Sequence, residues 1–289
     1  MSAKHPSDIA SKEIVLRGMK SREERLRLDF DRSHRQFVRR SEKNRLVVQE
    51  LAEKLRKLGI NLEQIRGDLG EERREKPGNP PINTTALLYK PFIFSAGQTI
   101  TKPYDYDWMW EATYGRPDIR THANKAGFSG WWSVYCDQNN PSAGYTTAGI
   151  GVYFAPPSQN GILNVSTAVD IKAHWGTWCN KAYATTWGKI ELIVDLFNVS
   201  NNEYVGEAVN LVGNIFFDYS YWFGIGDQYS SNSAYPISAN LPVDNSHWYV
   251  IWILTSGEVE AEGTGIFTGS YAEAYITMDV PYITWSYSG

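Results

Sequence analysis

An apolar residue recurs at every third or fourth position over the first part of the chain, which is the spacing of an amphipathic helix. The recurring positions are Ile9, Leu16, Met19, Leu26, Phe30 and Phe37, and after a weaker stretch Val48, Leu51, Leu55 and Leu58. From residue 8 to residue 58 there is no proline and a single glycine, Gly18, among many residues that favour helices. We therefore predict one long helix with an apolar seam along one face.

The residues after the last position of this seam predict where the helix ends. Gly59 suits the left-handed conformation that often follows the last residues of a helix. Asn61 can cap a new helix, because its side chain can accept a hydrogen bond from a free backbone N–H group. We therefore predict a break at residues 59–61, followed by a second and shorter helix that ends near Glu75.

Beyond residue 86 the apolar residues recur at every second position, which is the spacing of half-buried β-strands. The alternating sets run over Tyr104–Trp110, Ala148–Phe154, Leu163–Val169, Ile190–Leu196 and Ala272–Val280. Residues 248–254 are apolar at both parities, which predicts a central strand that is covered on both faces. Near Asp279–Pro281 the apolar residues change from even-numbered to odd-numbered positions, which predicts a bulge or a bend.

No helical pattern of useful length interrupts residues 86–289, and turn-forming pairs such as Asn201-Asn202 and Ser256-Gly257 separate the apolar runs. Roughly ten strands without crossover helices predict an antiparallel β-sandwich, jelly-roll-like in strand count, with a barrel as the alternative. The predicted fold class is therefore α + all-β, with an N-terminal long helix or coiled coil followed by an antiparallel β-sandwich.

Composition divides the chain in the same way. Residues 1–76 hold 20 Lys and Arg against 14 Asp and Glu, whereas residues 77–289 hold 8 against 18, and every Trp and Tyr lies beyond residue 88. The three prolines within residues 77–85 predict an extended linker. We therefore expect a helical stalk or docking segment at 1–76, the linker at 77–85 and the sandwich at 86–289.

An apolar seam on a charged helix needs another surface to cover it. Self-association as a coiled coil is the simplest solution, and Asn44 would then be a polar core residue that fixes register and copy number. Packing along the chain's own β domain, or along that of a neighbouring copy, is the alternative. The candidate oligomerisation residues are Leu26, Phe30, Phe37, Asn44, Val48, Leu51, Leu55 and Leu58.

Nucleic acid is not a predicted partner, although arginines are frequent between Arg17 and Arg45. Acidic residues are interspersed among them, and mixed signs at helical spacing usually make a solvated face. No apolar run is long enough to span a membrane, and the first residues lack the apolar centre of a secretion signal. We expect cytoplasmic synthesis, export by another route or incorporation into a particle.

Motifs that carry chemistry are missing from the sequence. It has no nucleophile elbow, no P-loop and no dinucleotide fingerprint, and its histidines and cysteines are too scattered for a zinc site. Two carboxylate pairs, Asp107 with Glu111 and Glu191 with Asp195, each share a strand face. Each pair would be about 13 Å apart, too far for the acid and base of a glycosidase without other strands. We therefore predict no enzyme, no cofactor and no metal.

The density of aromatic residues is the best indication of a function. A sugar ring can stack its C–H face on an aromatic side chain while Asp or Asn binds its hydroxyl groups, and aromatic anchors also suit protein partners. The candidate ligand-binding residues are Tyr106, Asp107, Trp108, Trp131, Trp132, Asp137, Asn139 and Trp222. Burial in a core is the alternative for each Trp. Trp131 and Trp132 are adjacent, so one of them should point outward from its strand.

Together these patterns predict a non-enzymatic, oligomeric assembly and binding protein. Its helical stalk would gather several copies of an aromatic-rich β-sandwich head, and multivalency would then strengthen weak binding to a glycan or a protein. The alternatives are a structural subunit of a larger particle or filament, and a carbohydrate-active enzyme.

Overall fold

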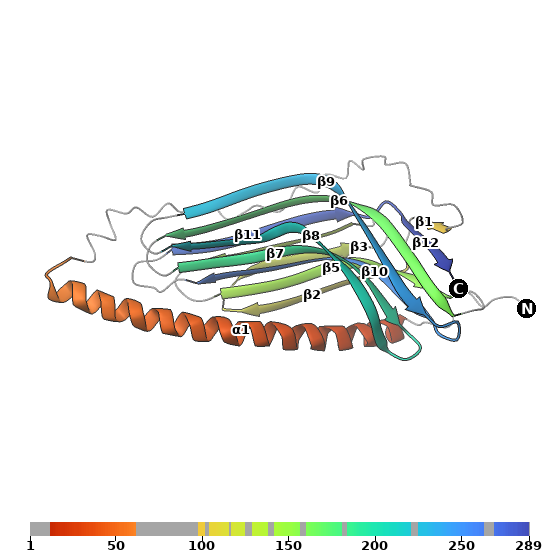
Figure 1. Ribbon diagram of the computed structural model, residues 1–289, viewed down its shortest axis with the longest axis horizontal. Coiled ribbons are helices and arrows are strands. Elements are labelled where there is room, and N and C mark those ends of the chain that lie inside the picture. Colours follow the sequence, from red (N-terminus) through yellow and green to blue (C-terminus); the bar gives the residue numbers. More distant parts are fainter. Residues whose placement is uncertain are drawn as a thin grey trace, which may run out of the picture.

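One long helix followed by two antiparallel β-sheets makes up the computed structural model of the protein (Figure 1). It describes residues 12–61, 98–101, 104–115, 117–124, 129–137, 142–156, 160–180, 184–220, 225–262 and 269–288. The helix, α1, spans Lys12–Lys57. The prediction of an N-terminal helix followed by an antiparallel β region is confirmed.

The strands divide into a seven-stranded sheet and a five-stranded sheet. The seven-stranded sheet has the order β1 (Gln98–Ile100), β12 (Ile283–Ser288), β6 (Gly161–Asn180), β11 (Gly269–Asp279), β4 (Ser129–Asp137) and β3 (Asp118–Asn124), with β9 (Ile225–Val243) also paired to β6. The five-stranded sheet has the order β2 (Tyr106–Tyr114), β5 (Ser142–Phe154), β10 (Tyr249–Glu262), β7 (Ala184–Asn198) and β8 (Glu203–Ser220).

The two sheets share one apolar core. Ile150 and Leu192 of the five-stranded sheet lie in the same buried cluster as Leu163 and Ile276 of the seven-stranded sheet. These residues belong to the sets that alternate along the sequence, so the two-residue spacing correctly predicts which faces of the strands are buried. Two antiparallel sheets with a common core are the arrangement that a β-sandwich requires.

The bend predicted near the C-terminus is confirmed. β11 ends at Asp279 and β12 begins at Ile283, and both strands pair with β6. The pairing register shifts by one residue between them, from Asp279 opposite Asp170 to Thr284 opposite Ser166. The shift explains the change of parity, because one extra residue moves the apolar side chains to the other set of positions.

The strand predicted to be covered on both faces is β10, and it lies between β5 and β7 with every residue buried. The turn expected at Ser256-Gly257 is wrong, because β10 continues through it and Gly257 pairs with Thr146 and Ile190. A strand with hydrogen-bonded neighbours on both sides has all its backbone groups satisfied without a turn. The local turn signal is therefore overridden by the sheet.

The second face of the five-stranded sheet is covered by α1, which lies lengthwise along its outer side (Figure 1). Met19 and Phe30 of the helix form a second apolar cluster with Trp108 of β2 and Trp252 of β10. The molecule is thus layered as helix, sheet and sheet. The helix layer explains why residues of both parities along β10 are apolar.

The first half of the helix seam is covered by the β-sheet and not by the expected coiled coil. Phe30 is buried in the cluster with the sheet and Leu26 packs against it. Phe37 is buried beside His34, whose ring meets Tyr114 of β2. The chain's own β domain covers this half, because an aromatic sheet face offers more apolar surface than a single facing helix stripe.

The helix ends as the sequence indicates. Gly59 is left-handed, with a φ of 77°, and its N–H group donates to the Arg56 carbonyl at 3.0 Å. The Ile60 N–H group donates to the Leu55 carbonyl at 3.1 Å, which completes a Schellman motif. The second helix and the linker at 77–85 lie outside the described residues, so the division into domains stays a prediction.

Candidate functional site

Two of the three predicted ligand-binding residues of β2, Tyr106 and Trp108, are turned toward the helix, whereas Asp107 lies on the other face of the strand. Trp108 is only 5% exposed, its Nε1–H group donates to Glu23 Oε1 at 3.2 Å, and the Arg22 guanidinium lies 5.9 Å from its ring centre. Tyr106 and Asp107 are half-buried on the same strand. Trp108 therefore binds α1 in this arrangement and presents no free face to a ligand.

The other predicted residues belong to a different part of the molecule. Trp131, Trp132 and Asp137 lie on β4 of the seven-stranded sheet, where the Trp131 backbone is opposite Thr277 and that of Trp132 is opposite Ile276. Their side chains are outside the described part of the chain, as are Asn139 and Trp222. A ligand site on β4 therefore stays a prediction.

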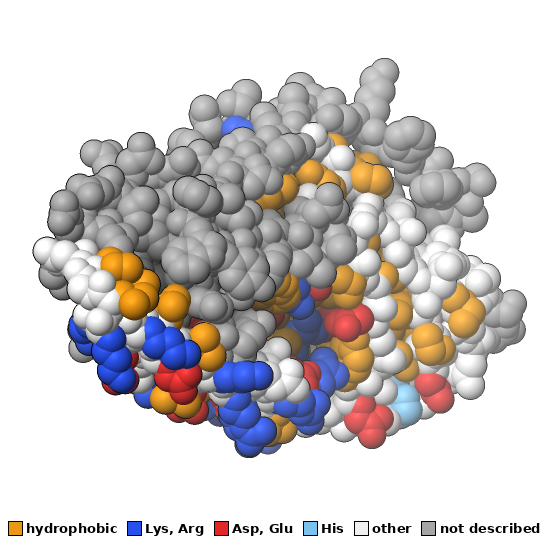
Figure 2. All heavy atoms as spheres, turned by 60° about the vertical axis from the view of Figure 1, so that its left-hand side comes forward, with side chains coloured by type: hydrophobic (Ala, Val, Ile, Leu, Met, Phe, Trp, Pro, Cys, Tyr) orange, Lys and Arg blue, Asp and Glu red, His pale blue; other side chains and the backbone are white. Residues whose placement is uncertain are grey.

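A cavity of about 470 Å³ lies between α1 and the five-stranded sheet. Its lining comes from the helix (Arg22, Arg25, Leu26, Asp29, Phe30, Ser33), from β5 and β10 (Tyr145, Glu258), from β7 (Lys189, Glu191, Ile193) and from β8 (Tyr204, Glu207, Val209). Figure 2 shows basic and acidic side chains side by side along one edge of the molecule, around a hollow. The volume is typical of a site for a small molecule.

One end of the cavity is fixed by a buried ion pair between Arg22 and Asp195 of β7. Arg22 occupies a position in the apolar seam between Met19 and Leu26, so the docked helix carries it into the interface. Burial lowers the pKa of the Arg22 guanidinium. Pairing with Asp195 offsets this cost of desolvation, and the pair thereby fixes how the helix lies on the sheet.

The wall formed by β8 combines an aromatic ring with charged groups. The Arg25 guanidinium stacks over the Tyr204 ring, with its Cζ atom 3.9 Å from the ring centre. Tyr204 also shares a hydrogen bond with Glu207. Burial, assisted by the charge of Glu207, raises the pKa of Tyr204, so its hydroxyl group keeps its proton. A stacked Arg of this kind leaves its N–H groups directed to the sides, where they can serve a ligand.

The floor holds two carboxylates around one ammonium group. Lys189 Nζ lies 3.2 Å from Glu191 Oε1 and 3.9 Å from Glu258 Oε2. The Ser256 hydroxyl donates to the other oxygen of Glu191 at 3.2 Å. Burial raises the pKa of Glu258, an effect that the charge of Lys189 opposes. Burial therefore makes Glu258 easier to protonate than a glutamate in water, although Lys189 lies beside it.

Sequence reasoning missed most of this site. It paired Glu191 with Asp195 on one strand, whereas the structure uses Asp195 to hold Arg22 and places Glu191 beside Lys189. A signal was present in the outward positions of β7, where Asp195 stands between the apolar residues Ile193 and Phe197. An acidic residue among apolar ones on a covered face needs a buried cation, and an Arg inside the helix seam is the matching residue.

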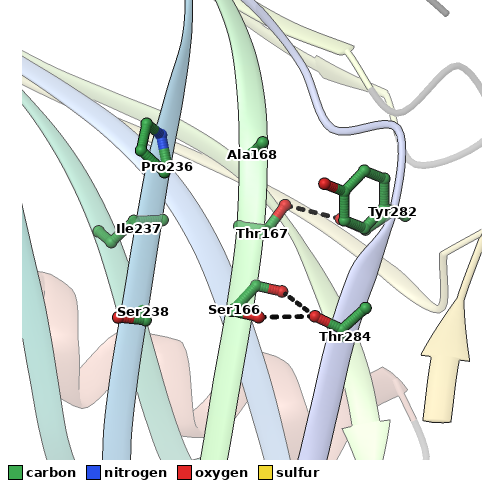
Figure 3. A pocket seen from close by; sticks show the side chains of 8 residues that line it. All are labelled: Ser166, Thr167, Ala168, Pro236, Ile237, Ser238, Tyr282 and Thr284. Carbon is green, nitrogen blue, oxygen red and sulfur yellow. Dashed lines mark hydrogen bonds between the residues drawn. The ribbon is translucent and has the colours of Figure 1, made fainter. Parts of the chain in front are cut away.

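A second pocket, of about 390 Å³, lies beside the bend between β11 and β12 (Figure 3). Three of its hydroxyl groups are engaged within the protein: Thr167 donates to the Tyr282 carbonyl at 2.6 Å, and the Ser166 and Thr284 hydroxyl oxygens are 2.6 Å apart. No charged side chain lines this pocket. It offers a ligand little beyond shape, so the cavity under α1 is the stronger candidate.

Metal ligands do not cluster in the described part of the chain, where no group of three or more His, Cys, Asp or Glu side chains could hold an ion. Within the same residues, no helix combines the length and the apolar character needed to cross a membrane.

The described part of the chain forms two antiparallel β-sheets and one covering helix, and no family model and no curated protein matches the chain. Solved structures resemble it slightly. The enzymatically active domain of tailspike protein 4 from bacteriophage CBA120 is 10% identical over 63% of this chain and 19% of its own length, with a TM-score of 0.18. The family 11 carbohydrate-binding module from Clostridium thermocellum is 8% identical over 64% of this chain and 97% of its own, with a TM-score of 0.18.

A third similar structure is that of infectious bursal disease virus, Gt strain, which is 7% identical over 74% of this chain and 45% of its own length. Its TM-score is 0.17. The chain spans about a fifth of the tailspike domain and under half of the viral protein. Values of this size do not define a common fold, so the function has to be argued from the chain's own residues.

Proposed function

We propose that the protein is a non-enzymatic assembly and binding protein. In this proposal copies associate through the second half of α1, and each copy carries a sandwich, jelly-roll-like in strand count, that binds a ligand. The observation that carries it is the exposure of large apolar side chains on that half of the helix: Leu46 is 59% exposed, Val47 39% and Leu58 74%. The helix also runs on past the ends of the strands there (Figure 1).

The spacing of these residues supports a helix-to-helix contact. Val47, Leu51, Leu55 and Leu58 follow one another at intervals of four, four and three, so they share one face of α1. Leu51 and Leu55 are half-buried, whereas the residues at the two ends of the stripe are exposed. A second copy offers the same stripe, and the pairing of two such stripes buries apolar surface that each copy alone leaves in water. The side chains of Asn44 and Val48 lie outside the described residues, so their part in this contact stays a prediction.

The experiment is the solution mass of the full chain by sedimentation equilibrium, with a double variant Val47→Glu/Leu58→Glu. We expect a multiple of the 32.8 kDa chain mass for the wild type and the single-chain mass for the variant. Gln49→Glu is the matched control, because it adds a charge on the opposite side of the same exposed helix turn. A single-chain mass for the wild type at high concentration would contradict the proposal, and open-ended polymers would favour the filament alternative.

A carbohydrate-active enzyme is the second candidate, and one observation favours it. Glu191 and Glu258 both contact Lys189, so the contacting carboxylate oxygens are at most about 7 Å apart, which is close enough for the acid and base of a glycosidase. Burial raises the pKa of Glu258, as a general acid requires. Release of reducing ends from oligosaccharides by the wild type, lost in Glu258→Gln with the solution mass unchanged, would establish this candidate instead.

A further inference from the structure

We infer that the cavity between α1 and the five-stranded sheet is a binding site for a neutral sugar unit, and that the docked helix is part of that site. The inference rests on the proposed function in one respect, which is that the β domain is the part of each copy that binds a ligand. It adds the place of the site, the class of its ligand and a coupling between ligand and helix.

Charges of both signs line the cavity, and their pairing with one another argues against a singly charged ligand. Three basic side chains line it, and four acidic ones face them: Arg22, Arg25 and Lys189 against Asp29, Glu191, Glu207 and Glu258. Most of these charges already have partners, Lys189 with both Glu191 and Glu258 and Arg22 with Asp195. A ligand with a net charge would have to compete with these pairs, whereas a neutral polar ligand can join them.

Hydroxyl groups are the ligand groups that fit such a mixture. Each hydroxyl donates one hydrogen bond and accepts others, so it can bridge a carboxylate and a neighbouring cation. The cavity alternates these partners: Glu191 and Lys189 on the floor, and Glu207 and Arg25 on the wall. Hydrogen bonds to charged groups are stronger than those between neutral groups, which suits a ligand that is well hydrated in water.

The apolar part of the lining matches the other side of a sugar ring. Leu26 and Phe30 of the helix and Ile193 of β7 contribute apolar side chains, and Val209 of β8 stands at the rim with 47% of its surface exposed. The C–H groups of a pyranose can rest against such side chains while its hydroxyl groups face the charges. A cavity with one polar side and one apolar side therefore selects a ligand that is amphipathic in the same way.

Helix docking completes the site, because Arg25, Leu26 and Asp29 reach it only while α1 lies on the sheet. A ligand that binds only the docked form must stabilise that form, by an amount that grows with its concentration. The coupling works in both directions, so changes that loosen the helix must weaken the binding of the sugar.

The test uses the full chain with glucose, galactose, N-acetylglucosamine and cellobiose as neutral probes, and with glucuronate as an anionic probe and protonated glucosamine as a cationic one. Binding is measured by saturation-transfer NMR and by isothermal titration calorimetry. We expect at least one neutral sugar to bind and to raise the thermal unfolding midpoint of the wild type. Val209→Trp, which fills the rim, and Glu191→Gln, which replaces a hydrogen-bond acceptor on the floor, should each weaken that binding at least tenfold.

Met109→Trp is the matched control, because it adds the same side chain at an exposed position of β2 that does not line the cavity. It should bind the sugar as the wild type does. The inference is overturned if no neutral probe binds, if glucuronate or glucosamine binds more tightly than every neutral sugar, or if both cavity variants bind unchanged. Solution mass measured on the same samples separates this failure from that of the proposed function, since copies can associate whether or not the cavity binds sugar.

Discussion

The two halves of α1 have similar apolar seams in different surroundings. In the first half Val15, Met19 and Phe30 are buried against the five-stranded sheet. In the second half Val47 and Leu58, at the two ends of the stripe, are exposed, whereas Leu51 and Leu55 are half-buried. The same apolar spacing is therefore covered by the sheet in the first half, whereas in the second half it leaves both ends of the stripe in contact with water.

Polar residues within the seam make the difference. The first half carries Arg22 and His34 in its buried face. In the sheet, Asp195 pairs with Arg22 and the ring of Tyr114 contacts His34. A charged residue inside an apolar seam restricts the surfaces that can cover it, because few of them offer a buried counter-charge. The first half is thus specific for one sheet, whereas the second half is complementary to any matching apolar stripe.

The largest expected effect comes from breaking the ion pair of the docked half. Asp195→Ala leaves the Arg22 charge buried without its counter-charge, and should lower the free energy of unfolding in urea by about 3–5 kcal/mol. The double variant Arg22→Met/Asp195→Leu removes both charges and should recover most of that loss. A loss below about 1 kcal/mol for the single variant would mean that the pair does not hold the helix.

A glycine in the docked half tests how closely the helix approaches the sheet. A Cβ atom at Gly18 would collide with the ring of Phe197 on β7. Gly18→Ala should therefore destabilise the protein by about 1–3 kcal/mol in thermal or urea unfolding. On an undocked helix the same change should stabilise by about 1 kcal/mol, so the sign of the effect separates the two states. Adding Phe197→Leu, which shortens the opposing side chain, should relieve the loss.

Gly18 also shows what the sequence could predict and what it could not. The helix, its end at Gly59 and the strands of the β region follow from local spacing and were predicted correctly. A glycine within a helical pattern usually signals a close contact, yet nothing in the sequence names Phe197 as the contact. Contacts between residues so far apart in the chain depend on the order of strands, which spacing alone does not give.

The candidate site was missed for the same reason. Trp108 was predicted to bind a ligand, but its position under α1 makes it a structural contact in this arrangement. The cavity joins Arg25 of the helix to Lys189 and Glu258 of two strands that pair only in the folded sheet. Apolar residues at both odd and even positions of β10 indicated that another layer covers its outer face. They could not indicate that this layer is α1.

His34 offers a smaller test of the docked half, through pH. Both of its ring nitrogens lack a hydrogen-bond partner, and its ring lies against Phe37 and Tyr114. Burial lowers the pKa of His34 from its ordinary value of 6.5, and the charge of Asp31 opposes this. The unfolded chain therefore takes up the proton at a higher pH than the folded chain, so stability must fall as the pH drops below 6.5.

The measurement is the free energy of unfolding between pH 7.5 and pH 5.5 for the wild type and for His34→Phe. The wild type should lose up to about 1.4 kcal/mol per pH unit more than the variant over this range. The difference between the two chains is the useful quantity, because the raised pKa of Glu258 contributes a pH dependence of opposite sign to both. Parallel curves for the two chains would show that His34 is not buried as described.

The smallest effect on the isolated chain is expected in the second half of the helix. Leu58→Glu changes a side chain of the stripe that is 74% exposed, so at high dilution it should alter the free energy of unfolding by less than about 0.5 kcal/mol. At high concentration the two chains should diverge, because association stabilises only a chain that can associate. The wild-type unfolding midpoint should rise with protein concentration while that of the variant stays constant. A midpoint independent of concentration in both chains would mean that the exposed stripe has no second copy as its partner.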